Sequence, residues 1–476
     1  MVEVVRGIIY FDVHSCAVAS LVFLLLFPSF FFACLHLYLL QILFTLCRSE
    51  GIGGGGGDDG QRMARGIQHA HYELERSELN IHFKGSGCIV LVDGDATVYG
   101  APLKRNVRYN FSRCGIPVVC SLSCRVHVEG EFTAKISLMS SAIDDIHALL
   151  DLARADATIS NDVPREFHDK GPRGPRVLVV GNQNTGKSSL CRALANLATS
   201  DKKYGVALVD TDVGQQGIAC PGSIATAFIE EYIPVDDGFN AMMPLIFFFG
   251  DKTVTASSRK RYLDLCAFTS QAIASVCMSR PQYAIGGVIV NTMGWTTGIG
   301  RDILFELISI FSITHVVVCG SDEELAEELR RAAIGHGITP LRYPKQPRLF
   351  HRGRSQLCES RTEQLLTYFK GTIRTPLSPY RGVAFVKDVY FLNALTLEVL
   401  SWQEVAPLSV AAVSWSDSLE SVDEANIAGF IVLLEIGKRF FSFLSPASGN
   451  LPKPFLLVSS TIKLPWSKVP PFTAPG

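Results

Sequence analysis

The sequence predicts an α/β fold in which a central parallel sheet, with helices on both faces, is flanked by two small β domains. Between residues 173 and 370, apolar strand-like runs alternate with helical segments, as they do in parallel sheets. On either side of this region, short apolar runs are separated by turn residues, the pattern of antiparallel strands. A chain of 476 residues is long enough for two or three such units.

The domain limits follow from the places where these patterns change. Residues 71–140 hold runs such as CIVLVDG and CRVHVEGEF and are predicted as an N-terminal β domain. Residues 141–375 are predicted as the central domain, which starts with a helix over 141–155. Residues 376–466 return to short strands and are predicted as a C-terminal β domain, followed by a Pro-rich tail over 467–476.

The N-terminal segment differs from the rest of the chain. From Val13 to Cys47 there is no Asp, Glu, Lys or Arg, and the apolar run exceeds the roughly 20 residues that cross a bilayer. Taken alone, this run favours a membrane anchor, whereas a signal peptide is disfavoured because no small-residue cleavage site follows. A glycine tract then leads to Met63, and ordinary globular sequence begins shortly after it. We therefore predict that residues 1–70 lie outside the fold and that the protein has no membrane partner.

Composition excludes some classes of function. The net charge is −1 and the pI is about 6.8, so any nucleic-acid contact must come from a local groove and not from whole-chain charge. The 13 cysteines lie singly or in loose pairs such as Cys120 and Cys124, without a second pair at zinc spacing. They are predicted to be mostly buried free thiols in a reducing compartment.

The strongest functional signal is the segment GNQNTGKSS, from Gly181 to Ser189. It matches the P-loop pattern GxxxxGK[ST] and lies between an apolar strand, RVLVV, and a helix, KSSLCRALANLA, which is the context that the motif requires. In such a loop, backbone N–H groups surround phosphates, Lys187 reaches the β- and γ-phosphates, and the Ser188 hydroxyl is placed to bind Mg²⁺. The predicted nucleotide-binding residues of the loop are Gly181, Asn184, Thr185, Gly186, Lys187, Ser188 and Ser189.

A second strand, VALVD, ends in acidic residues shortly after the P-loop helix. Such a carboxylate holds Mg²⁺ or takes a proton from an attacking hydroxyl group, which makes Asp210 and Asp212 candidates. Because side chains alternate along a strand, the two carboxylates are expected to face the same side. A later strand leads into Asn291-Thr-Met-Gly-Trp295 and carries no Asn-Lys-x-Asp motif for guanine, which favours ATP as the nucleotide.

Two further segments lie where a ligand is expected. Trp295 follows a strand at the edge that binds ligands in open α/β sheets, and it either stacks on a nucleobase or packs under a helix. The stretch from Arg342 to Arg361 is rich in basic residues. This stretch is either a lid that places arginines on a transferred phosphoryl group or a solvated basic loop.

Together with motifs elsewhere in the chain, these segments resemble the Clp family of polyribonucleotide 5′-hydroxyl kinases. The resemblance runs from about Tyr72 to Ser460 and includes, in family order, ELERSEL, the DxDxGQ run, NTMGW, LSPY and the closing LPKPFL. It implies three domains around an RNA-kinase-type P-loop domain and a location in the nucleus. It also implies RNA as substrate and, as partners, the other subunits of the pre-mRNA cleavage and polyadenylation machinery.

The resemblance also implies roles for single residues, with ATP and Mg²⁺ as cofactors. The implied residues are Lys187, Asp212 and Arg352 for catalysis, Ser188 and Asp212 for the metal, Glu78 for the adenine side, and Trp295 for the RNA base.

Three positions depart from the family pattern. Asn184 replaces an aspartate of the P-loop, Pro117 stands near the place of a lysine of the N-terminal domain, and Leu357 replaces a second lid arginine. The last departure matters most, because an arginine on a transferring phosphoryl group is worth about 10³–10⁵ in rate.

Two hypotheses about function therefore remain. Intact Lys187 and Asp212 favour a kinase that moves the γ-phosphoryl group of ATP to the 5′-hydroxyl of RNA. Leu357 favours an ATP-bound scaffold of the cleavage machinery that does not turn over. Arg354 or Arg361 can replace the missing arginine only if the lid folds differently from that of the family.

Overall fold

The computed structural model describes residues 67–161, 173–200, 204–239, 242–334, 337–344 and 353–471. The predictions for Arg352 and for residues 1–66 of the N-terminal extension lie outside these described residues. The first strand begins at Gln68, which assigns the last three residues of the predicted extension to the fold. In the described part of the chain, no helix combines the length and the apolar character needed to span a bilayer.

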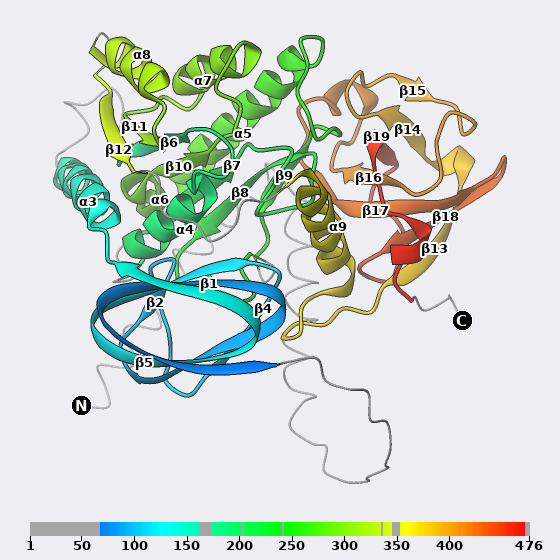
Figure 1. Cartoon of the computed structure of the whole chain (residues 1–476). Coiled ribbons are helices and arrows are strands. Elements are labelled where there is room, and N and C mark those ends of the chain that lie inside the picture. Colours follow the sequence, from blue (N-terminus) through cyan, green and yellow to red (C-terminus); the bar gives the residue numbers. More distant parts are fainter. Residues whose placement is uncertain are drawn as a thin grey trace, which may run out of the picture. The chain divides into compact units, whose positions relative to one another are not determined.

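The N-terminal β domain is a five-stranded antiparallel sheet in the order β3-β2-β5-β1-β4. Its two long strands curl round a shared apolar core, because both halves of β1 pair with β5 (Figure 1). The prediction of many short strands is wrong here, since register shifts let a long strand bend where the sequence suggests a turn. The strands are β1 (Gln68–Gly94), β2 (Thr97–Val98), β3 (Ala101–Pro102), β4 (Arg108–Ser112) and β5 (Gly115–Leu138).

The central sheet has seven strands in the order β12-β11-β6-β10-β7-β8-β9. The first five of these pair in parallel, as predicted, whereas β8 runs antiparallel to both neighbours. The chain reverses at β8 because the segment between Asp210 and Ser223 contains no crossover helix. The strands are β6 (Arg176–Val180), β7 (Val206–Asp210), β8 (Ser223–Ile229), β9 (Leu245–Phe248), β10 (Val288–Asn291), β11 (His315–Cys319) and β12 (Thr339–Tyr343).

Helices cover both faces of this sheet, which confirms the predicted fold class. In β6, Val177 and Val179 pack in the core that holds α3, α4 and α9, whereas Leu178 and Val180 pack in the core that holds α5, α7 and α8. Burial on both faces is why these strands appear as continuous apolar runs in the sequence. The helices are α3 (Ala142–Asn161), α4 (Lys187–Ala198), α5 (Arg259–Ser279), α6 (Pro281–Gly286), α7 (Ile299–Ile310), α8 (Glu323–Ile334) and α9 (Arg354–Lys370).

The C-terminal strands form a second seven-stranded sheet of mixed direction, in the order β13-β18-β17-β16-β19-β14-β15. One of its faces shares a core with the central sheet and α9, which lies between the two sheets (Figure 1). Phe430 on this face meets Phe248 of β9 with ring centroids 5.5 Å apart. The strands are β13 (Tyr380–Phe385), β14 (Tyr390–Asn393), β15 (Val399–Leu400), β16 (Ser409–Ser414), β17 (Ile427–Ile436), β18 (Phe440–Ser445) and β19 (Phe455–Lys463).

Candidate nucleotide-binding site

The P-loop joins the carboxyl end of β6 to the first turn of α4. Gly181 has a φ of 143°, and a Cβ atom there would lie 2.4 Å from the carbonyl oxygen of Cys319 in β11. Gly186, just before α4, has a φ of 102°. Only glycine adopts such conformations without strain, while Asn184 at a φ of 60° occupies the left-handed region that asparagine enters more readily than most residues. The backbone conformation therefore accommodates asparagine at this position.

Lys187 is held inside the loop by backbone carbonyl groups. Its Nζ atom donates to the carbonyl oxygens of Gly181 at 2.8 Å and of Asn182 at 3.0 Å, and its side chain is buried. The Thr185 hydroxyl donates to the same Asn182 carbonyl at 2.8 Å. The ammonium group thus lies against the loop backbone, where it can exchange carbonyl oxygens for phosphate oxygens.

Asn291 connects the P-loop helix to the acidic strand end. Its Nδ2 atom donates to the Ser188 hydroxyl at 3.2 Å and to Asp210 Oδ1 at 2.9 Å. The contact follows from topology, because β10 and β7 are parallel neighbours in which Asn291 stands opposite Asp210. The predicted site residues did not include Asn291, although its position at the end of an apolar strand beside the acidic one is a usable signal.

The two aspartates do not alternate along one strand, contrary to the expectation from the sequence. β7 ends at Asp210, and Asp212 lies in the next turn, where its Oδ1 accepts hydrogen bonds from the backbone N–H groups of Gly214 and Gln215, both at 3.0 Å. The turn forms because an aspartate can bind its own backbone two and three residues ahead, which competes with extension of the strand.

The surroundings of both carboxyl groups disfavour their charged forms. Burial, and then the charge of Asp212, raise the pKa of Asp210 to about 7, against the hydrogen bonds from Asn291 and the Gly217 N–H group. Burial also raises the pKa of Asp212, while the backbone N–H groups and Lys187 act in the opposite direction. The site is therefore a low-dielectric edge in which an added cation would be strongly attracted.

Trp295 lies in the loop between β10 and α7, next to the P-loop. The neighbouring Thr296 hydroxyl donates to Asn182 Oδ1 at 2.8 Å. A Cβ atom at Gly300 would lie 2.4 Å from Trp295 Cγ, so the indole packs against the first turn of α7. Its side chain is half-buried, so packing against a helix is confirmed for α7, and stacking on a nucleobase stays a prediction.

The basic segment reaches this edge through α9. Arg361 Nη1 donates to the carbonyl oxygen of Gly214 at 3.5 Å, and its charge acts on Asp212. Leu357 lies one helical turn earlier on α9 and is half-buried. The structure thus brings Arg361 to the turn that holds Asp212.

The N-terminal β domain contacts the P-loop helix through the turn between β2 and β3. Asn196 Nδ2 donates to the Tyr99 carbonyl oxygen at 2.6 Å, and the Arg192 guanidinium lies 4.9 Å from the centroid of the Tyr99 ring. Glu78 lies elsewhere in this domain, on β1, where burial raises the pKa of its carboxyl group and Asn80 lowers it. The described interactions of Glu78 are therefore local to its own domain.

The site defines a P-loop nucleotide-binding protein. It combines a glycine loop, a buried lysine, a helix N-terminus and a pair of carboxylates at the carboxyl edge of a parallel sheet.

The family model for the P-loop of the mRNA cleavage and polyadenylation factor CLP1 matches residues 181–371. A polyribonucleotide 5′-hydroxyl-kinase Clp1 from Xenopus laevis is 30% identical over 416 residues, covering 81% of this chain and 92% of the relative. The Gallus gallus protein of the same name is 29% identical over 430 residues, covering 85% of this chain and 97% of the relative.

Solved structures agree with this assignment at the level of the fold. A wild-type Clp1p–Pcf11p complex matches with a TM-score of 0.71 at 19% identity, covering 84% of this chain and 99% of the other. A second structure, of an extended interface between Pcf11p and Clp1p, matches with a TM-score of 0.72 at 18% identity. The chain belongs to the Clp1 family of polyribonucleotide 5′-hydroxyl kinases.

Proposed function

We propose that this protein transfers the γ-phosphoryl group of ATP to the 5′-hydroxyl of RNA, in the nucleus, together with other subunits of the pre-mRNA cleavage and polyadenylation machinery. The observation that carries the proposal is the hydrogen-bonded link from Ser188 through Asn291 to Asp210 beside the P-loop lysine. The relatives named as polyribonucleotide 5′-hydroxyl kinases match over most of their length, which supports the same reaction here. The structural likeness to a Clp1p–Pcf11p complex supports a partner of the Pcf11 type.

The donor atoms at this edge suit Mg²⁺, which prefers oxygen ligands and retains several waters. They are the Ser188 hydroxyl and the carboxylates of Asp210 and Asp212, without thiolate or imidazole ligands among the residues that we assign to the metal. Ser188 and Asp212 would hold the ion, and Asp210 would keep Asn291 in place beside it. Bound there, Mg²⁺ would neutralise charge on the β- and γ-phosphates.

Side chains of the protein itself would bind the phosphates, take the proton and position the RNA. Lys187 would bind phosphate oxygens in place of its present carbonyl partners. Asp212 uses Oδ1 for its backbone hydrogen bonds, while Oδ2 accepts none from the described residues, so Oδ2 is free to bind Mg²⁺ or to take the proton of the RNA hydroxyl. The partly exposed Trp295 can stack on the terminal base, and Glu78 remains the candidate for the adenine side.

Arg361 is the residue that we propose in place of the missing lid arginine. Phosphoryl transfer depends on charge stabilisation and positioning, since the protein does little covalent chemistry. Arg361 donates to the backbone of the turn that holds Asp212, so its guanidinium lies at the edge where the γ-phosphoryl group would be transferred. The Leu357 departure then does not remove all positive charge from this side of the site.

A labelling experiment tests the proposal directly. The chain is incubated with a short 5′-hydroxyl RNA, Mg²⁺ and ATP labelled at the γ-phosphate, and transfer of label to the RNA is measured. We expect label on the RNA 5′ end, with Lys187→Ala as the inactive control. ATP binding without any label on the RNA would instead support the second candidate, an ATP-bound scaffold, which Leu357 favours.

A further inference from the structure

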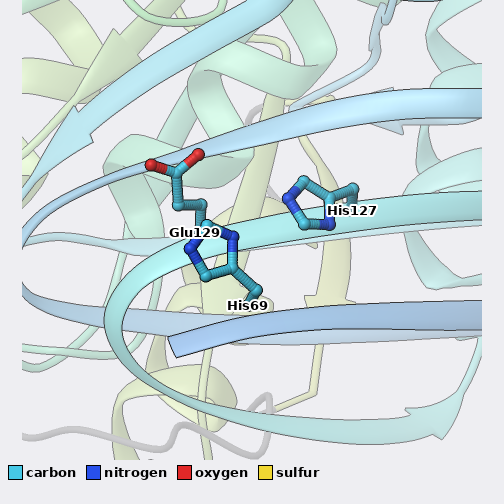
Figure 2. Close-up of side chains that lie close together, drawn as sticks. All are labelled: His69, His127 and Glu129. Carbon is cyan, nitrogen blue, oxygen red and sulfur yellow. The ribbon is translucent and has the colours of Figure 1, made fainter. Parts of the chain in front are cut away.

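Three potential metal ligands converge on the N-terminal β domain. His69 lies near the start of β1, and His127 and Glu129 lie on β5. One ligand atom from each lies within 4.8 Å of the others. Figure 2 draws the three side chains beside one another, with the His127 ring directed toward the other two.

The register of the sheet creates this cluster. β1 and β5 are antiparallel, with His69 opposite Glu129 and His71 opposite His127. Side chains alternate along β5, so His127 and Glu129 share one face, while Val126 and Val128 point into the core and are fully buried. All four polar side chains therefore lie on the outer face of the domain, and they are distinct from the nucleotide site.

The atoms of the cluster are chemically available to a metal. Both described contacts of the Glu129 carboxylate, with Arg108 Nη1 at 2.9 Å and Cys88 Sγ at 3.7 Å, use Oε2. Oε1 makes no hydrogen bond or ion pair with any described residue. The Nδ1 atom of His127 is buried and has no hydrogen-bond partner among the described residues, so its lone pair is available to a metal. Arg108 would not contact the metal itself, and its ion pair with Oε2 would hold the orientation of the Glu129 carboxylate.

We propose that His69, His127 and Glu129 bind a divalent transition metal of the zinc type. Two imidazoles and one carboxylate form a common protein ligand set for zinc, and imidazole excludes the hard ions Mg²⁺ and Ca²⁺ in favour of zinc or copper. The His71 ring, with its centroid 4.5 Å from that of His127, is the nearest candidate for a fourth ligand. Such an ion ties the first residues of β1 to β5 and so fixes the beginning of the domain.

The inference is tested by titrating the full-length chain with zinc chloride in a calorimeter. Excess Mg²⁺ is present so that oxygen ligands at the P-loop edge are occupied. We expect one zinc ion per chain and a rise in melting temperature when zinc is added. His69→Ala, His127→Ala and Glu129→Gln should each weaken zinc binding by at least about tenfold, since changes even outside the ligand set cost 10–100-fold.

The matched control is His147→Ala, because His147 pairs with Asp151 at 3.5 Å on α3 and lies outside the cluster. This variant should bind zinc as the wild type does. Nucleotide affinity, measured for every variant, reports that the fold is intact. Absence of zinc binding in the wild type, or equal zinc affinity in wild type, His127→Ala and Glu129→Gln, would overturn the proposal whether or not the protein proves to be a kinase.

Discussion

The carboxyl edge of the central sheet and the outer face of the N-terminal β domain both gather polar side chains, but in opposite surroundings. At the edge, Asp210 is 4% exposed, and its carboxylate accepts three hydrogen bonds from protein groups. On the outer face, His69 is exposed, and Oε1 of the half-buried Glu129 has no hydrogen-bond or ion-pair partner among the described residues. Buried polar groups must be satisfied by the protein itself, whereas surface groups can leave coordination to water or a ligand. Substitutions in the buried link between Asn291 and Asp210 should therefore affect folding as well as chemistry, and those on the outer face should affect only the ligand.

The largest effect on the rate is expected for Arg361, which α9 brings to the carboxyl edge of the central sheet. Arg361→Gln should lower the rate of RNA phosphorylation by about 10³-fold or more, because it removes positive charge from the transferring phosphoryl group. ATP affinity should change little, since the P-loop remains. The rates are compared at saturating ATP, so that only the step after binding is measured.

Two variants show how to interpret this result. Arg331→Gln, on the exposed side of α8 where Arg331 pairs with Glu327 at 3.2 Å, is the control and should retain the wild-type rate. Leu357→Arg should add little if Arg361 already supplies the charge. A large gain from Leu357→Arg, with no loss from Arg361→Gln, would contradict the role of Arg361 and would mean that the family position itself is needed.

Lys187→Ala should weaken ATP binding by about 10- to 100-fold. Each hydrogen bond from a charged donor is worth roughly 1.5–3 kcal/mol, and every 1.4 kcal/mol corresponds to tenfold in affinity. The fold should survive, since the carbonyl groups of Gly181 and Asn182 that accept from the lysine belong to its own loop. Calorimetric titration with ATP measures the effect, and equal affinity in wild type and variant would refute the assignment of the site.

Asn291→Ala at the edge and His69→Ala on the outer face compare the two regions directly by the free energy of unfolding. Removal of the amide leaves buried Asp210 Oδ1 with one donor fewer and breaks the link to Ser188. The expected loss in the free energy of unfolding is about 1–3 kcal/mol, measured by urea denaturation. His69→Ala on the outer face, without added metal, should stay within about 0.5 kcal/mol. Similar losses in both variants would show that burial does not distinguish the two regions.

The smallest effect is expected for the N-terminal segment. A chain that begins at Met63 should remain in solution and bind ATP as the full chain does, because the first strand of the described residues begins at Gln68. Sedimentation and ATP titration check this expectation. Aggregation of the shortened chain, together with a full-length protein that needs detergent and stays active, would instead favour a membrane anchor.

Features carried by contiguous residues could be predicted from the sequence. The P-loop, from Gly181 to Ser189, combines a glycine pattern with a strand before it and a helix after it. The strands of the central sheet were also predictable, because burial on both faces demands unbroken apolar runs. In the N-terminal β domain the same reasoning failed for strand length, since bends within β1 and β5 resemble turns in the sequence.

Only the tertiary structure decided which distant side chains meet. Asn291 reaches Asp210 across 81 residues, and Arg361 reaches Gly214 across 147. His69 and Glu129 meet because of one particular register between two antiparallel strands. The amino-acid sequence by itself determined the α/β class and the phosphate loop, because hydrophobic periodicity and glycine conformations are local properties of the chain. The link through Asn291, the position of Arg361 and the histidine cluster depend on strand order, register and helix packing, which arise only when the chain has folded.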